Sequence, residues 1–164
     1  TRTAGRYPDK EALVDGTRRL TYRELEEAVN ALAHGLINRG YTRGDSLALM
    51  SGNSLEFLVV YYACAKAGVI VVPISLVWRT HEISYVLGHS RAKGVVVEAQ
   101  LFESLELALA ENPAVEAIVA PGLAGPELPE ELGPRLIPTA QPATGPPHTA
   151  PERARGAHAP QPAM

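Results

Sequence analysis

The sequence predicts an α/β fold: a partial, doubly wound and mostly parallel sheet with flanking helices. Two observations lead to this prediction. Residues 44–75 read as strand, tight turn, apolar helix and second strand, with β-branched residues at 69–72. Further strand-like and helix-like segments then alternate as far as residue 120. Strands that alternate with helices run parallel, because a crossover helix returns the chain to the same end of the sheet.

The first predicted element is a β-hairpin near the start of the chain. Residues 11–14 and 18–20 are short extended runs, and the dipeptide Asp15-Gly16 lies between them. This dipeptide is favoured in hairpin turns because both residues tolerate a positive φ. We therefore expect two antiparallel strands before the first long helix.

An amphipathic helix is predicted next. Thr21 and Glu24 match a capping box, in which each side chain accepts a hydrogen bond from the backbone N–H group of the other residue. Gly40 ends the segment, because glycine readily adopts the left-handed conformation that follows many helices. Apolar residues at helical spacing between these signals predict burial on one side. They are Leu25, Val29, Leu32, Leu36 and Ile37.

The helix between the two central strands is predicted to be buried on most sides. Asn53 precedes it as the expected N-cap, and Glu56 follows three residues later, where a carboxylate completes a capping pair. Gly68 ends this helix. Between these signals only Glu56 and Lys66 carry charge, so the helix has no broad polar face. Lys66, Gly68 and Pro73 also interrupt the apolar run, which argues against a membrane span of about 20 residues.

The remaining predicted elements repeat the alternation. A helix begins at Thr80, and a strand covers residues 94–98. A second helix covers residues 101–111, because Pro113 prevents its continuation, and a last strand covers residues 115–120. The first of these two helices has one apolar side, formed by Ile83, Val86 and Leu87.

The composition changes at Pro121, which predicts two regions. Residues 1–120 form the α/β part, whereas residues 121–164 are rich in proline, alanine and glycine and hold eleven of the 14 prolines. Such a segment buries too little apolar surface to offset about 1 to 2 kcal/mol of backbone entropy per ordered residue, so we expect a disordered tail. Two origins stay open: a natural linker, or an out-of-frame translation of GC-rich coding DNA.

Composition excludes several classes of protein. The chain has 164 residues, a net charge of −3 and one cysteine, Cys64. A nucleic-acid-binding protein would show a clustered basic surface. The histidines lack metal-ligand spacing; they are His34, His81, His89, His148 and His158. The lone cysteine lies among apolar helix residues, which predicts a buried thiol and a cytoplasmic location. A start without Met or an apolar signal segment indicates a piece of a longer reading frame.

A series of short motifs runs through residues 7–120. They are Pro8-Asp9, Ala12-Leu13, Leu20-Thr21-Tyr22 with Glu24-Leu25, Gly40, Gly44-Asp45, Asn53 with Glu56-Phe57, 65–68, Val72-Pro73, 82–90 and Ala92-Lys93. Each motif is common by itself. Their order and spacing resemble the start of the adenylate-forming, or AMP-binding, superfamily, which includes acyl-CoA synthetases, firefly-type luciferases and nonribosomal peptide adenylation domains. Residues 1–120 would then be the N-terminal α/β part of the AMP-binding domain.

The resemblance implies a two-step reaction in the parent enzyme. A carboxylic acid, such as a fatty acid, attacks ATP with the help of Mg²⁺ to give an acyl-adenylate, and the thiol of coenzyme A then displaces AMP. The phosphoryl charge must be offset by metal, lysine and backbone N–H groups. The family's phosphate loop should stand where residues 121–164 are, and its C-terminal lysine has no counterpart. We therefore assign no catalytic, cofactor-binding or metal-binding residue and expect the chain alone to be inactive, without tight binding of ATP, CoA or Mg²⁺.

Trp78 and Arg79 are the candidates for a ligand loop. They follow the predicted strand at residues 69–72, and ligands of open α/β sheets bind at the carboxyl ends of strands. The alternative is a solvent-facing loop in which Trp78 packs against another part of the parent domain. Tyr61 and Tyr62 are expected to be buried with hydrogen-bonded hydroxyl groups.

The alternative function is a non-catalytic α/β binding or interaction module. It would use the turn at residues 51–53, at a helix N-terminus, as an anion site. The chain contains neither GxGxxG nor a Walker motif, which weakens a claim of independent nucleotide binding. Exposed apolar surface and open sheet edges would favour self-association of an incomplete domain. The acyl substrate, the thiol acceptor and the oligomeric state stay open.

Overall fold

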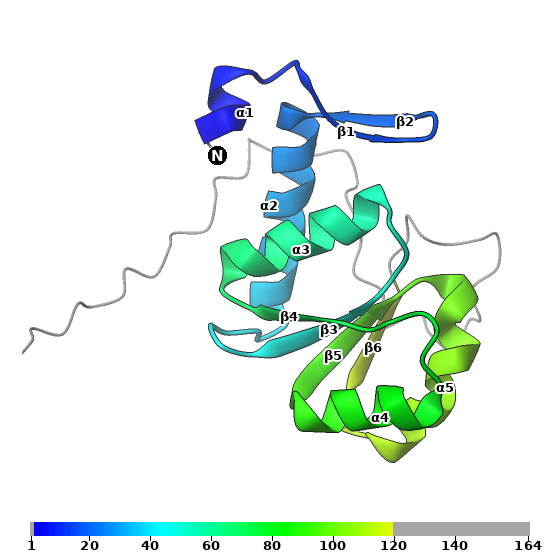
Figure 1. The fold of residues 1–164 in the computed structure, drawn as a ribbon. Coiled ribbons are helices and arrows are strands. Elements are labelled where there is room, and N and C mark those ends of the chain that lie inside the picture. The colour runs from blue at the N-terminus through cyan, green and yellow to red at the C-terminus, as the bar shows by residue number, and fades with distance from the viewer. Residues whose placement is uncertain (1, 120–164) are drawn as a thin grey trace, which may run out of the picture.

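The computed structural model describes residues 2–119, whose central feature is a four-stranded sheet (Figure 1). The strands lie in the order β4-β3-β5-β6, and every neighbouring pair is parallel. The strands are β3 (Ser46–Met50), β4 (Ile70–Pro73), β5 (Ala92–Val97) and β6 (Glu116–Val119). The predicted α/β class and parallel sheet are confirmed. The segment predicted to be a tail, residues 121–164, lies outside the described residues.

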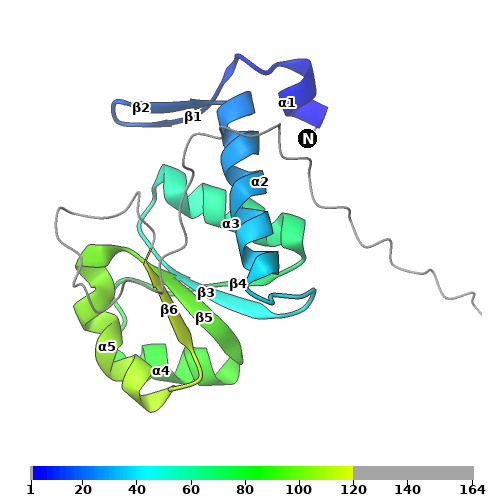
Figure 2. The same ribbon diagram turned by 180° about the vertical axis from the view of Figure 1, so that it is seen from behind.

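Helices cover both faces of this sheet (Figures 1 and 2). On one face lie α2 (Tyr22–Asn38) and α3 (Leu55–Ala67), and on the other lie α4 (Thr80–His89) and α5 (Phe102–Glu111). A short 3₁₀ helix, η1 (Ala99–Leu101), leads into α5. The sheet is therefore doubly wound, as predicted.

Alternate residues of strand β3 point to opposite faces of the sheet, as strand geometry requires. Leu47 and Leu49 belong to the core beneath α2 and α3. Ala48 and Met50 belong to the core beneath α4 and α5. All four are at most 1% exposed. The strand reads as a continuous apolar run because it is covered on both sides.

The predicted hairpin forms a separate antiparallel pair, β1 (Glu11–Asp15) and β2 (Arg18–Thr21). Asp15 still pairs with Arg18, so the turn consists of Gly16 and Thr17 and lies one residue later than expected. Gly16 has the positive φ of +58° that the turn requires. A short helix that the sequence analysis did not predict, α1 (Arg2–Arg6), precedes the hairpin.

Helix α2 begins with the predicted capping box. The backbone N–H of Glu24 donates to Thr21 Oγ1 at 3.3 Å, and the backbone N–H of Thr21 donates to Glu24 Oε2 at 2.7 Å. The backbone N–H of Thr21, together with its hydroxyl, which donates to Glu24 Oε2 at 2.8 Å, holds the pKa of the Glu24 carboxyl below its ordinary value. The helix buries one side as expected, except that Ile37 is 41% exposed.

The N-cap of α3 is Ser54, so the prediction that Asn53 caps this helix is wrong. Ser54 has extended backbone angles, and its hydroxyl accepts the N–H of Phe57 at 3.1 Å. The helix thus begins one residue later than expected, and Glu56 stands too early for a capping pair. Instead Glu56 is buried and forms an ion pair with Arg18 of the hairpin. Gly68 ends the helix with φ +76°, as predicted.

Lys66 connects the two helices on this face of the sheet. Its ammonium group donates to Glu26 Oε1 at 2.5 Å and to Asn30 Oδ1 at 2.6 Å, both on α2. The side chains of Lys66 and Glu26 are only 16% and 18% exposed. An ion pair shielded from water in this way depends on both partners, because removing one leaves an uncompensated charge. The charge of Lys66 therefore stabilises the packing of α3 against α2.

Candidate functional site

The candidate site is the carboxyl edge of the sheet between β3 and β5. These two strands are neighbours, but the chain leaves β3 toward α3 on one face and leaves β5 toward α5 on the other. In open α/β sheets, ligands bind in the crevice at such a switch point. The residues that follow β3 and β5 therefore determine whether a ligand can bind in this crevice.

The carboxylate of Glu98 fills this switch point. Its Oε1 accepts the hydroxyl of Ser51 at 2.7 Å and the backbone N–H of Gly52 at 2.6 Å. Its Oε2 accepts the side-chain amide of Gln100 at 2.5 Å. Glu98 is only 7% exposed, and Ser51 is 8% exposed. A buried carboxylate from the end of β5 thus binds the turn that follows β3.

The hydrogen bonds of Glu98 use donors of the turn at residues 51–53, where the sequence analysis expected an anion site. The hydroxyl of Ser51 and the N–H of Gly52 would be donors to a bound anion, but both donate to Glu98. Two of the donors expected to bind an anion are therefore already used inside the chain, and the alternative function as a binding or interaction module stays a prediction. The sequence analysis did not single out Glu98. The available signal was a carboxylate directly after a β-branched strand, at the edge where ligands bind.

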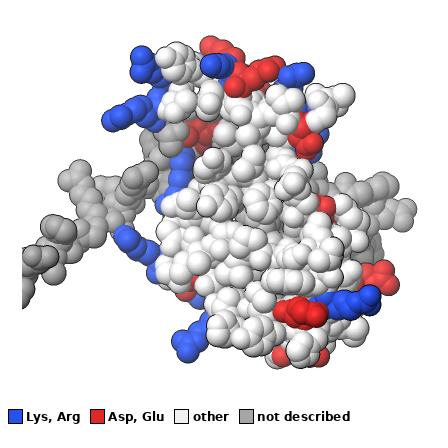
Figure 3. Space-filling view, in the orientation of Figure 1, with Lys and Arg blue, Asp and Glu red and all other residues white. Residues whose placement is uncertain are grey.

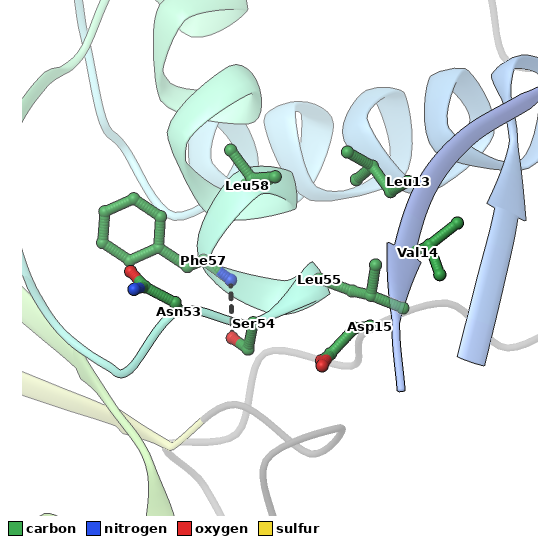
Figure 4. A pocket seen from close by; sticks show the side chains of 8 residues that line it. All are labelled: Leu13, Val14, Asp15, Asn53, Ser54, Leu55, Phe57 and Leu58. Atoms are coloured by element: carbon green, nitrogen blue, oxygen red, sulfur yellow. Dashed lines mark hydrogen bonds between the residues drawn. The ribbon is translucent and has the colours of Figure 1, made fainter. Parts of the chain in front are cut away.

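A cavity of ≈ 340 Å³ lies between the hairpin and the start of α3 (Figure 4). Its lining comes from β1, from the two residues before α3 and from the first turn of α3: Leu13, Val14, Asp15, Asn53, Ser54, Leu55, Phe57 and Leu58. The walls are largely apolar. Ser54 uses its hydroxyl to cap the helix, and the carboxylate of Asp15 would repel a phosphate. The cavity therefore does not suit the phosphates of ATP.

The two ligand-loop candidates lie between β4 and α4. Trp78 is 37% exposed, and its backbone N–H donates to the carbonyl of Ser75 at 3.2 Å. Arg79 is the N-cap residue of α4, and its backbone N–H donates to Glu82 Oε2 at 3.1 Å. Neither residue contacts Glu98 through any hydrogen bond recorded among the described residues. Their ligand-binding role stays a prediction.

One face of the molecule, over α3, β4 and α4, is almost free of charged residues, which gather at its rim (Figure 3). We call it the uncharged face. The elements under this face carry exposed apolar residues: Tyr61 and Tyr62 belong to α3, Ile70 belongs to β4, and Val77 belongs to the loop between β4 and α4. Val77 is 86% exposed. The face is broad and continuous, which is typical of a surface that another protein segment covers.

The prediction that Tyr61 and Tyr62 are buried is wrong. They are 45% and 47% exposed, and their rings meet edge to face with centroids 5.8 Å apart. The rest of α3 is covered as expected: among its 13 residues only Tyr61, Tyr62 and Ala65 are exposed, so the helix is buried on most sides. A helix that is apolar all round gives no sequence signal for which side meets the sheet.

Cys64 of α3 is fully buried, as predicted. Burial raises the pKa of its thiol from 9.0 to about 12, so it is not an activated nucleophile. Residues 2–119 contain no group of three or more His, Cys, Asp or Glu side chains that could hold a metal ion. No helix in that range is long and apolar enough to cross a membrane.

The whole of this fold, together with the sequence beyond it, matches a known family. The sequence model of the family described as "AMP-binding enzyme" matches residues 1–156. The chain belongs to the AMP-binding enzyme family. The family match runs past the boundary predicted at residue 120, and that boundary stays a prediction.

Individual members of the AMP-binding enzyme family show how much of such a protein the chain represents. It is 33% identical over 112 residues to a medium/long-chain-fatty-acid–CoA/3-oxocholest-4-en-26-oate–CoA ligase of Mycobacterium marinum, covering 68% of this chain and 20% of that protein. It is 37% identical over 100 residues to the mitochondrial medium-chain acyl-CoA ligase ACSF2 of Mus musculus, covering 60% and 16%. A benzoate CoA ligase structure from Burkholderia xenovorans LB400 matches with TM-score 0.69 and 28% identity, covering 75% and 25%. The chain thus spans a quarter or less of these relatives.

Proposed function

We propose that this chain is the N-terminal part of an AMP-forming acyl-CoA ligase, which joins a carboxylic acid to coenzyme A through an acyl-adenylate. The proposal rests on the family match across residues 1–156. The two ligases of M. marinum and M. musculus compared above are named for medium/long-chain fatty or medium-chain acyl substrates, which favours a fatty acid for the parent enzyme and a role in fatty acid metabolism. The cytoplasmic location stays a prediction.

We further propose that the chain alone does not catalyse adenylation. Transfer of the adenylyl group from ATP to the carboxylate, with pyrophosphate as the leaving group, requires a metal and preorganised donors around the phosphates. Losing one such donor commonly costs about 10² to 10³ in rate. The residues described here do not fit these groups. The donors at the switch point are bound to Glu98, and no cluster that could hold Mg²⁺ occurs within residues 2–119. ATP, CoA and Mg²⁺ therefore belong to the parent enzyme.

The role proposed for this part of the ligase is structural. Its own residues build four parallel strands and present the uncharged face to the rest of the domain. Covering Tyr61, Tyr62 and Val77 would remove apolar surface from water. Such burial stabilises a protein by about 25 cal/mol for each Å² of apolar surface. This would fix the sheet against the segments that bind ATP and the acyl group.

A chimera tests the positive part of the proposal. Residues 2–119 replace the matching segment of a characterised benzoate CoA ligase, and benzoyl-CoA formation is measured. We expect the chimera to fold and to keep the activity, because the grafted segment supplies the same sheet. The matched control carries Gly94→Ala in the graft. A Cβ atom at this position of β5 would overlap the Tyr41 hydroxyl oxygen, so this control should give less folded protein. A chimera that melts like the host enzyme but forms no benzoyl-adenylate would contradict the proposal.

An exchange assay tests the inactivity of the chain alone. Purified, mass-verified chain is incubated with ATP, labelled pyrophosphate, Mg²⁺ and a panel of short, medium, long-chain and aromatic carboxylates. We expect no carboxylate-dependent exchange, while the intact benzoate CoA ligase gives exchange with benzoate in the same buffer. Exchange by the chain itself would refute the inactivity and require phosphate-binding groups within it.

A further inference from the structure

The buried carboxylate of Glu98 has no part in the function proposed above, yet all its recorded partners belong to one site. Oε1 binds Ser51 and Gly52 at the end of β3, and Oε2 binds Gln100 in the turn that leads to α5. The backbone N–H of Glu98 also donates to the carbonyl of Met50 at 3.3 Å, which extends the β3–β5 pairing by one residue. One residue thus joins both strands at the switch point.

Physical chemistry explains why a carboxylate is stable in this place. Burying a charged group costs free energy unless hydrogen bonds compensate it, and three donors point at Glu98. Hydrogen bonds to an ionised oxygen are stronger than those between neutral groups. The turn also leads directly into the N-terminus of α3, where the helix dipole favours negative charge.

We propose that Glu98 is a positioning residue that acts as an internal ligand: its carboxylate takes the place of an external anion and holds the turn between β3 and α3. Gly52 and Ser51 are then fixed by the chain itself, and Ser54, three residues beyond Ser51, is held in register to cap α3. The switch point is closed to phosphate. In a parent ligase, the phosphates of ATP would bind elsewhere. The proposal does not depend on the ligase function, because it concerns this chain alone.

Hydrogen exchange at the Gly52 amide tests the proposal in the full 164-residue chain. In Glu98→Ala, we expect this amide to exchange about tenfold faster or more, because it loses a charged acceptor. Amides of β5 and β6 should keep their protection. Sodium formate should restore the slow exchange in a saturable manner by filling the vacated position, whereas sodium chloride at equal concentration should not. Gln100→Ala is the matched control, since it removes only the outer hydrogen bond and should have a small effect.

Several outcomes would overturn the proposal. They are unchanged exchange at Gly52 in Glu98→Ala, equal acceleration of all amides, and identical effects of formate and chloride. Inorganic phosphate that slows the Gly52 amide in the wild-type chain would also overturn it, because the site would then be open. If Glu98→Ala is unfolded in buffer, recovery of its circular dichroism signal in formate supports the proposal, and failure to recover in formate overturns it.

Discussion

The side chain of Tyr41 lies directly against the α carbon of Gly94, in the space that any larger residue at position 94 would need. A Cβ atom at this position would overlap the Tyr41 hydroxyl oxygen and stand 2.9 Å from the carbonyl oxygen of Glu116 on the neighbouring strand. Tyr41 is 4% exposed, and its hydroxyl has no hydrogen-bond partner within the described structure. Strand β5 therefore needs glycine here because the Tyr41 hydroxyl oxygen occupies the space of a Cβ atom, whereas the φ of Gly94 is not positive.

Gly94→Ala should destabilise the chain by about 1 to 3 kcal/mol, the usual cost of overpacking a core. The loss is measured as a lower midpoint of urea unfolding. Gly52→Ala is the matched control, because its Cβ would meet the nearest atom at 3.6 Å, an ordinary contact. Equal midpoints for both variants would contradict the packing described here.

Tyr41→Phe should unfold at an equal or higher urea concentration than the wild type. The hydroxyl is buried without a partner, so its removal relieves a desolvation cost. The same change should reduce the penalty of Gly94→Ala, since the overlapping oxygen is gone, and a double-mutant cycle measures this coupling. Additive effects, or a clear destabilisation by Tyr41→Phe alone, would count against the contact.

Ser54→Ala should cost about 0.5 to 2 kcal/mol, because Ser54 caps α3. Asn53→Ala, one residue earlier, should leave the unfolding free energy nearly unchanged, since Asn53 is exposed and does not cap. Both are read from urea titrations under the same conditions. If Asn53→Ala lowers the unfolding free energy more than Ser54→Ala does, Asn53 is the N-cap, as the sequence predicted.

Stability should fall as pH rises above about 9, because burial keeps Cys64 protonated in the folded state. Its pKa is raised from 9.0 to about 12, so between pH 8 and 10 the unfolded thiol ionises while the folded thiol does not. The unfolding free energy should drop by about 1.4 kcal/mol more in the wild type than in Cys64→Ala. Burial also raises the pKa of Tyr41, and this largest cause of the Tyr41 shift is present in both proteins. An equal drop in both would refute the assignment.

The chain should self-associate through the uncharged face when it is alone. Val77→Glu and Tyr62→Glu place charge on exposed positions of this face and should shift the protein toward monomer in light scattering. Leu107→Glu is the matched control: residue 107 is 66% exposed but lies on α5, which is not one of the elements that form the uncharged face. A wild-type monomer at high concentration that binds no hydrophobic dye would contradict the prediction.

Local sequence signals predicted the helices and strands of the main sheet because short-range physics decides them. The capping box of Thr21 and Glu24, the left-handed Gly68 and the turn glycine Gly16 each act within a few residues. The alternation of strands and helices was enough to predict a parallel, doubly wound sheet. Where the same reasoning needed single-residue accuracy, at Asn53 and Ser54, it was one residue wrong, because both residue types make good caps.

The candidate site could not be predicted in this way. Glu98 and Gly52 are 46 residues apart, and they meet only because β3 and β5 are neighbours in the sheet. Likewise, the exposure of Tyr61 and Tyr62 depends on which side of an apolar helix meets the core. The sequence by itself determined the class of fold, the family and the order of its elements. Tertiary packing alone decided that the carboxylate of Glu98 closes the switch point. The order of the strands within the sheet brings Glu98 and Gly52 together, and no local sequence pattern encodes this strand order.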